Sequence, residues 1–358
     1  MNRSLHNVDP EVSVLMSCFN ASRWLQVAVS SVLAQTFREF EFIVVDDGST
    51  DRTLSIIRSY QDQDKRIVII PKENTGLAHS LNVGISHAKG RWVARLDADD
   101  LCEPGRLEAQ LAYADNHPSL VLLGTGCTEI NEEGQAIRKH KYPPGHRKLL
   151  CHLERLQSFF PHSSALYRAD VVRKIGGYNS RFSRSEDHEL WLQLVSKGKI
   201  ACLSKPLVRV RKHSRQISLE DLGRRNIYDG IAAAICHFLR KANFRDPSAG
   251  TTESEWTSFM SWVEGRVEDV GIFRTYKAWS DARDIFYSVG SRWKRLFLLG
   301  PQLLQSGHAC TLAREKCFGN PLPQRLAREW IRRTGAISKA SPWATMLLLL
   351  CSLLKSSF

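Results

Sequence analysis

The sequence predicts an α/β protein in which helices flank a Rossmann-like, mostly parallel sheet. Short apolar stretches alternate with amphipathic ones through the first third of the chain. The distance between apolar stretches leaves room for one helix each, as in parallel β-α-β units. Two of the predicted strands end in acidic turns, at Asp46-Asp47 and at Asp97 to Asp100. Because the carboxyl ends of parallel strands share one edge of a sheet, both turns can face a single crevice.

Four strands and three helices are expected in this first third. The strands are predicted from runs of aliphatic and aromatic residues at 12–16, 40–45, 66–70 and 91–96. The third helix is predicted over 76–88. Asn20 or Ser22 is the expected N-cap of the first helix, and Ser49 or Thr50 that of the second, because these side chains can accept a backbone N–H.

The middle of the chain continues the alternation. Apolar residues predict strands over 120–130 and 159–167. Asn131 to Gly134 has the composition of a hairpin turn after the first of these strands. A helix is predicted over 187–195 from its stripe of leucine, tryptophan and valine.

The turn after the fourth strand places three carboxylates, Asp97, Asp99 and Asp100, within four residues. Carboxylates this close repel one another and lose hydration unless a cation joins them. Spacing i, i+2 directs Asp97 and Asp99 to the same side where the strand ends. A divalent metal that prefers oxygen ligands meets this requirement. The alternative is an acidic surface turn without a ligand.

Composition and motif content exclude several classes of protein. The first strand is not followed by GxGxxG, and no Walker lysine loop occurs, so a nucleotide would be bound through carboxylates and a metal. Nine cysteines without a CxxC pair favour free thiols in a reducing compartment. The first eleven residues hold no signal-peptide core, and the longest apolar run, Ala344 to Leu354, is shorter than a membrane span. We therefore expect a cytoplasmic protein.

Several different short motifs lie along the first two thirds of the chain. They are Val14 to Asn20, Gln35-Thr36-Phe37, Val44 to Asp51, Asn74 to Leu77, Leu81 to Gly84, Leu96 to Asp100, Arg106-Leu107 with Gln110, Gly176-Gly177-Tyr178, and Glu186-Asp187 with Leu190-Trp191. In this order and at these intervals they resemble glycosyltransferase family 2 of the GT-A fold, a large group of inverting sugar-nucleotide transferases. The resemblance implies a catalytic domain over 1–220 and leaves 221–358 as a separate region.

The resemblance assigns a nucleotide-sugar donor, most often a UDP-sugar, to the acidic turns. Asp46 and Asp47 would contact the uracil and the ribose, with Phe19 on the same side of the site. Asp97 and Asp99 would be the DxD pair that holds Mn²⁺ or Mg²⁺ against the diphosphate. For Asp46 and Asp47 the alternative is a favourable position at the start of the next helix.

Three positions depart from the family pattern. They are Leu81, where an arginine that helps to bind the diphosphate is frequent, Ser17, where proline is usual, and Gln193, where arginine is frequent. The task of the missing arginine must fall to Lys72, to Arg95 or to the basic loop 208–213, or be absent.

The resemblance makes Asp187 the catalytic base, because a sugar hydroxyl must lose its proton as it attacks the anomeric carbon. Glu186 would position the acceptor, and His162 and Trp191 would lie in the acceptor pocket. His213 would reach the metal or the diphosphate. The alternatives are a helix cap for Asp187, a satisfied core histidine for His162 and a solvated basic loop around His213.

Beyond residue 220 the chain is expected to be mainly helical, with pieces over 226–242 and 303–318. From Gly290 onward basic residues far outnumber acidic ones, and tryptophans and leucines are interleaved with them. This pattern suits peripheral contact with an anionic membrane surface, here the inner face of the plasma membrane. The alternative is a helical bundle with a solvated basic face. Nucleic acid is not an expected partner, because no nucleic-acid-binding motif is present.

The sequence thus predicts an inverting, metal-dependent glycosyltransferase that adds one sugar to a hydroxyl of a glycan or lipid-linked glycan precursor. Gln324 to Trp330 lacks the Gln-x-x-Arg-Trp spacing of processive synthases. A catalytically silent nucleotide-binding scaffold is one alternative, against which the intact Asp97, Asp99 and Asp187 argue. A nucleotidyltransferase of related fold is another, and the lack of a glycine-rich N-terminal loop argues against it.

Overall fold

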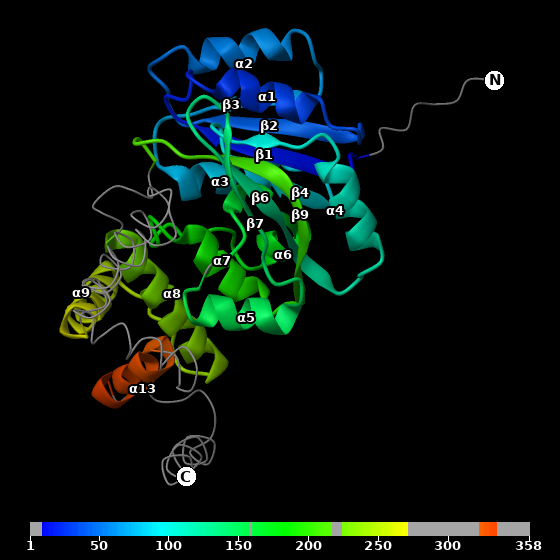
Figure 1. Ribbon diagram of the computed structural model, residues 1–358. Helices are drawn as coiled ribbons and strands as arrows, with labels where there is room; N and C mark the ends of the chain where they lie inside the picture. Colours follow the sequence, from blue (N-terminus) through cyan, green and yellow to red (C-terminus); the bar gives the residue numbers. More distant parts are fainter. Residues whose placement is uncertain (1–8, 158, 217–223, 271–321, 335–358) are drawn as a thin grey trace, which may run out of the picture. The chain divides into compact units, whose positions relative to one another are not determined.

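The computed structural model describes residues 9–157, 159–216, 224–270 and 322–334 (Figure 1). The chain divides into two compact units, which are described separately. The first unit comprises Met1–Leu153 with Gln157–Glu220, and the second comprises Glu154–Leu156 with Asp221–Phe358.

The described part of the first unit is built on a sheet of nine strands in the order β3-β2-β1-β4-β8-β6-β9-β5, with β7 paired to β6. The strands are β1 (Val12–Cys18), β2 (Phe40–Asp46), β3 (Ile67–Pro71), β4 (Trp92–Arg95), β5 (Leu101–Cys102), β6 (Leu120–Ile130), β7 (Ala136–His140), β8 (Leu166–Arg168) and β9 (Lys199–Arg211). Strands β1 to β4 pair in parallel, as predicted. The rest of the sheet is mixed, because β8 runs antiparallel to both β4 and β6, whereas β6 and β9 are parallel.

Helices cover both faces of the parallel strands. Figure 1 shows α1 (Leu25–Leu33) and α2 (Thr53–Gln61) together on one side of β1 and β2, and α3 (Leu77–His87) on the other. The alternation of side chains along β1 explains this arrangement. Val14 and Met16 belong to the same apolar cluster as the buried face of α1. Leu15 points the other way, against Gly84 of α3, where an added Cβ would lie 2.1 Å from the leucine Cδ1 atom.

The remaining helices of the first unit follow the later strands. They are α4 (Arg106–Asp115), α5 (His146–Glu154), the 3-10 helix η1 (His162–Ser164), α6 (Ala169–Lys174) and α7 (Glu186–Leu194). Residue Glu154, at the end of α5, already belongs to the second unit. The predicted turn at Asn131 to Gly134 joins β6 to β7, and Gly134 adopts a φ of 85° that favours glycine.

The predicted N-caps of the first two helices are wrong. Helix α1 follows Trp24 and α2 follows Arg52, and neither residue makes a side-chain cap. Asn20 instead accepts the N–H of Thr50 at 2.8 Å, and its own N–H donates to the Ser49 hydroxyl at 3.0 Å. The expected capping residues therefore bind each other and tie two loops together across the sheet edge.

The predicted strand over 159–167 is also wrong in its first part. Pro161 has no N–H to give to a ladder, and the chain turns through η1 before β8 begins at Leu166. The turn takes His162, Ser163 and Ser164 out of strand register. His162 and Ser163 thereby contact residues of the loops described below.

The described part of the second unit contains α8 (Arg224–Lys241), α9 (Glu253–Asp269) and α13 (Leu322–Thr334). Helix α8 covers the helix predicted over 226–242, whereas the piece over 303–318 and most of the basic region from residue 290 lie outside the described residues. Aromatic rings join α9 to α13, with Trp330 lying 5.0 Å from Phe259 and 4.9 Å from Trp262. No helix in the described ranges is long and apolar enough to cross a membrane.

Candidate active site

The two acidic turns lie at the same edge of the sheet. In the parallel pair of β1 and β2, Cys18 is opposite Asp46, and in the pair of β1 and β4, Leu15 is opposite Arg95. Both turns therefore leave the sheet at the carboxyl ends of neighbouring strands, where open α/β sheets bind ligands.

Asp47 organises the first turn and the start of α3. Its carboxylate accepts the N–H of Thr75 at 3.0 Å and that of Gly76 at 2.9 Å. Lys72 Nζ forms an ion pair with the same carboxylate and donates to the Thr75 hydroxyl at 2.6 Å. Burial raises the pKa of Asp47, but the hydrogen bonds from Lys72 and Thr75 outweigh it and hold that pKa below its ordinary value. Lys72 thus serves the donor side through Asp47, and its direct contact with a diphosphate stays a prediction.

Phe19 contrasts with the carboxylates at the end of the neighbouring strand. Asp46 and Asp47 are 2% and 3% exposed, whereas Phe19, the residue after β1, is 51% exposed. Burying such a ring is favourable, so an exposed phenylalanine at this edge offers a flat surface to a ligand.

Ser163 holds the second turn together through three contacts. The Ser163 hydroxyl oxygen lies 2.6 Å from Asp97 Oδ2 and 2.5 Å from Asp100 Oδ2. The backbone N–H of Asp97 donates to the same hydroxyl at 3.1 Å. Asp97 Oδ1 pairs with Arg95, and Asp100 Oδ1 accepts the N–H of Arg211 at 2.8 Å. Both carboxylate oxygens of Asp97 therefore have a partner within the protein, Ser163 for Oδ2 and Arg95 for Oδ1.

Burial acts to raise the pKa of all three carboxyls in this turn, and the neighbouring charges oppose or add to that effect. At Asp97 the charge of Arg95 outweighs burial and holds the pKa below its ordinary value. Burial and the charge of Asp97 raise the pKa of Asp99, and burial with both neighbouring charges raises the pKa of Asp100 well above its usual range. Since a hydroxyl has one hydrogen, a protonated Asp100 can donate to Ser163 while Ser163 donates to Asp97.

Asp99 and His213 form the pair best suited to hold a divalent cation. Asp99 Oδ2 and His213 Nε2 are 2.8 Å apart, and two adjacent ligands at about 2.1 Å from one cation would be about 3 Å apart. Within the described ranges no group of three or more acidic, histidine or cysteine side chains is arranged to hold a metal. Mg²⁺ commonly takes one or two protein ligands together with substrate phosphates, so the pair fits a site that a diphosphate completes.

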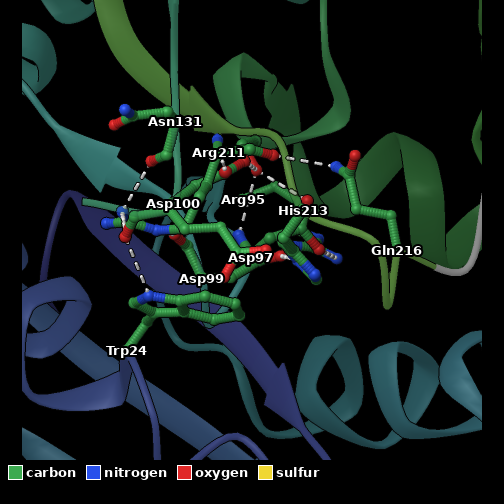
Figure 2. A network of polar contacts seen from close by, with 11 residues as sticks. Trp24, Arg95, Asp97, Asp99, Asp100, Asn131, Arg211, His213 and Gln216 are labelled. Atoms are coloured by element: carbon green, nitrogen blue, oxygen red, sulfur yellow. Dashed lines mark hydrogen bonds and ion pairs between the residues drawn. The ribbon is translucent and has the colours of Figure 1, made fainter. Parts of the chain in front are cut away.

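Trp24 and Arg211 support this pair, and sequence reasoning did not find them in this role. The indole of Trp24 lies 4.5 Å from the His213 ring and 5.3 Å from the Arg211 guanidinium, and its N–H donates to the Glu132 carbonyl. Arg211 is 3% exposed and donates to the carbonyl oxygens of Asp99, Asn131 and Glu132. Its guanidinium therefore connects these loops, and direct contact of the basic loop 208–213 with a diphosphate stays a prediction. Only the contacts between distant segments reveal these roles (Figure 2).

Glu186 and Asp187 begin α7, and the charge of Asp97 acts on both of them. Burial and the neighbouring charge of Asp187 raise the pKa of Glu186 to about 8. Burial also raises the pKa of Asp187, partly offset by a hydrogen bond from the N–H of His188 and by the charge of Arg95. The two carboxyls interact, so near neutral pH the pair shares about one proton. With a pKa of about 8, Glu186 holds a proton near neutral pH.

His162 and Trp191 pack behind this carboxyl pair. His162 Nε2 lies 2.7 Å from the Tyr178 hydroxyl, and its Nδ1 lies 3.8 Å from Glu186 Oε1. Burial and the charge of Arg95 lower the pKa of His162 well below its ordinary value, so the ring is neutral. Trp191 is 1% exposed and meets the His162 ring edge-on at 5.8 Å. Trp191 therefore supports His162 from beneath, and direct contact with an acceptor would need it to move.

Sequence comparisons connect the chain to a known family. The model of glycosyl transferase family 2 matches residues 13–176. The putative glycosyltransferase EpsE of Bacillus subtilis is 36% identical over 216 residues, which cover 58% of this chain and 75% of that protein. The O-antigen biosynthesis glycosyltransferase WbnJ of Escherichia coli is 30% identical over 238 residues, which cover 64% and 89% of the two chains.

Solved structures share the fold. S. aureus TarS 1-349 in complex with UDP-GlcNAc superposes with a TM-score of 0.54 and 20% identity, over 72% of each chain. The mannosyltransferase PcManGT from Pyrobaculum calidifontis, in complex with GDP-Man and Mn²⁺, gives a TM-score of 0.50 and 16% identity over 90% of this chain and 88% of that one. With the relatives above, these findings show that the chain has the GT-A fold, belongs to glycosyl transferase family 2 and is a glycosyltransferase.

Proposed function

We propose that this glycosyltransferase is inverting and metal-dependent, and that it moves one sugar from a nucleotide-sugar, by first choice a UDP-sugar, to a hydroxyl of a glycan or lipid-linked glycan precursor. One observation carries the proposal. The charge of Asp97 acts on members of two pairs of side chains: Asp99 with His213, which suits a cation, and Glu186 with Asp187, which suits a proton acceptor. An in-line displacement needs a charge stabiliser at the leaving group and a base at the attacking group.

On the donor side, the nucleoside would lie against the first acidic turn. Asp46 and Asp47 would accept hydrogen bonds from the base and ribose, and the exposed ring of Phe19 would pack against the base. A uridine nucleotide is the first choice because TarS has been solved with UDP-GlcNAc. PcManGT has been solved with GDP-Man, so guanosine nucleotides are the second choice.

Asp99 and His213 would hold Mn²⁺ or Mg²⁺, with Asp97 adjacent. When bound, the cation would neutralise charge on the leaving nucleoside diphosphate. The chain's own residues prepare this position in advance. Ser163 and Arg95 fix Asp97, and Trp24 fixes the ring of His213.

On the acceptor side, Asp187 would take the proton from the attacking hydroxyl. Glu186, which holds its proton near neutral pH, can donate a hydrogen bond that positions the same acceptor. Attack opposite to the leaving nucleoside diphosphate in a single step would invert the anomeric centre. The neutral ring of His162 would close the floor of this side.

The acceptor class is proposed from the biosynthetic roles for which two relatives are named. WbnJ is named for O-antigen biosynthesis, and AmsE of Erwinia amylovora, 32% identical over 210 residues, for amylovoran biosynthesis. Helix α13 presents Arg328, Arg332 and Arg333 at exposed positions, which suits a cytoplasmic protein in peripheral contact with an anionic membrane surface. Replacing all three by glutamine should weaken sedimentation with anionic vesicles and leave neutral vesicles unaffected.

Calorimetric titration with UDP in the presence and absence of Mn²⁺ tests the central proposal. We expect metal-dependent binding that Asp99→Ala abolishes. Asp115→Ala, an exposed aspartate on α4, is the matched control and should bind as the wild type does. Turnover of UDP-GlcNAc with NMR analysis of the released sugar's anomer then tests inversion. Binding of neither UDP nor GDP would refute the enzyme proposal and favour a silent scaffold.

A further inference from the structure

The guanidinium of Arg95 is buried without full compensation beneath the site. Arg95 is 0% exposed and donates to Asp97 through Nη2. Its Nε and Nη1 groups have no hydrogen-bond partner among the residues that the structure describes. A buried charge with unpaired donors costs several kcal/mol, so such a group calls for an explanation.

The surroundings of Arg95 supply one. Besides Asp97, its charge acts on Glu186 and Asp187 at the start of α7 and on His162 in η1. The phenol groups of Tyr167 and Tyr178 also lie close enough to interact with it. Arg95 is therefore a buried positive charge that acts on Asp97 and on the pair of Glu186 and Asp187.

Arg106 shows what a purely structural buried arginine looks like in the same chain. It is also 0% exposed, and Nη2 donates to the Ala165 carbonyl, the acceptor of the Arg95 backbone N–H. Its remaining donors meet neutral acceptors, Gln110 Oε1 at 2.9 Å and Cys102 Sγ at 3.2 Å. Arg106 ties α4 to the segment before β8, and among the residues that the structure describes it makes no ion pair with a carboxylate.

We propose that Arg95 is a positioning residue for the transfer reaction, holding Asp97 on the metal side and favouring the ionised form of Asp187 on the base side. This inference rests on the proposed function of those carboxylates. Because Arg95 is wholly buried, it touches neither donor nor acceptor, and it acts through the side chains that do. It would thus fix the two halves of the site relative to each other before substrate binds.

The charge makes a specific prediction for Asp187. The groups that act on its carboxyl are Glu186 and the backbone N–H of His188 on its own helix, with Arg95 and Asp97 from β4 and the turn after it. Removing the positive charge leaves burial and the negative charge of Asp97 opposed only by backbone hydrogen bonds. The pKa of Asp187 should therefore rise, by about one pH unit for a unit charge several ångströms away at an intermediate dielectric.

The test compares Arg95→Met with Arg95→Lys and with Arg106→Met as the matched loss of a buried guanidinium. Carbon-13 NMR of protein labelled at the aspartate side-chain carboxyl follows Asp187 in the resting protein, with Asp187→Asn assigning its signal. We expect the Asp187 midpoint to move up by about one pH unit in Arg95→Met, and to stay within a third of that in Arg95→Lys and Arg106→Met. Should Arg95→Met fail to fold, Arg95→Gln carries the same expectation.

Turnover gives the second readout, with hydrolysis of UDP-GlcNAc in the presence of Mn²⁺ as the probe. In Arg95→Met the kcat should fall about 10- to 100-fold with little change in the donor KM, and the acid limb of kcat should move to higher pH. Equal Asp187 midpoints in Arg95→Met and Arg106→Met would overturn the inference whether or not the protein is active. A raised Asp187 midpoint in Arg95→Met, together with a wild type that binds neither UDP nor GDP, would instead refute the proposed function alone.

Discussion

Ser163→Ala should destabilise the protein more than any comparable loss of a hydroxyl near the site. The Ser163 hydroxyl contacts Asp97 Oδ2 at 2.6 Å, Asp100 Oδ2 at 2.5 Å and the Asp97 N–H at 3.1 Å. Alanine removes all three contacts at once and adds no clash. The cost depends on what can replace each of them.

Water can replace only part of what is lost. The Asp97 side chain is 36% exposed, so solvent can take over its contact. Asp100 is 4% exposed and its Oδ2 would lose its partner without access to solvent. A hydrogen bond to a charged or protonated carboxyl contributes about 1.5–3 kcal/mol. Counting the Asp100 contact in full and discounting that of Asp97, we expect the free energy of unfolding to fall by about 2–3 kcal/mol.

Ser164→Ala is the control. Ser164 is equally buried but bonds only neutral groups, donating to the Pro161 carbonyl at 2.9 Å and accepting the Thr125 N–H at 3.2 Å. Its loss should cost about 1 kcal/mol. Both variants are measured by thermal and urea unfolding, followed by circular dichroism. Ser163→Ala should lower the midpoint temperature of the first thermal unfolding transition by about 5–10 °C. A loss no larger than that of Ser164→Ala would refute the reasoning.

Three further predictions concern single side chains. Asp187→Asn should lower kcat by about 10²–10⁴-fold and leave metal-dependent UDP binding intact in calorimetry; lost binding would mean that Asp187 belongs to the donor side. Because the folded pKa of Asp47 lies below its unfolded value of 3.8, its contribution to stability is present above pH 3.8 and is lost as pH falls toward the folded value. Lys72→Met should flatten that loss in acid titrations of urea midpoints, and an unchanged slope would contradict it. Trp24→Ala should weaken Mn²⁺-dependent UDP binding about tenfold by freeing the ring of His213, whereas Trp24→Phe should retain most of it; equal affinity in both variants would count against the support role.

Local sequence signals predicted the first half of the fold well. The strands of the parallel sheet are continuous apolar runs, and a run of this kind needs cover on both faces whatever its neighbours are. The alternation of strands and helices along the chain and the position of the acidic turns followed from these runs. Failures occurred where local rules compete with contacts from elsewhere. Asn20 and Ser49 are good capping residues, yet they bind across the sheet edge to each other's loops.

The amino-acid sequence by itself determined the α/β class, the two acidic turns at one edge and the residue types that suit a cation and a base, because periodicity and strand ends are properties of short segments. Tertiary structure alone decided which of these residues meet. Asp99 pairs with a histidine 114 residues away, Ser163 bridges two carboxyls 66 and 63 residues away, and Lys72 is drawn to Asp47. It also decided the charge states, since burial and neighbouring charges act through space and not along the chain. The buried Arg95 is an example. In the sequence it is one strand residue among many, but in the structure it pairs with Asp97 and its charge acts on Asp187.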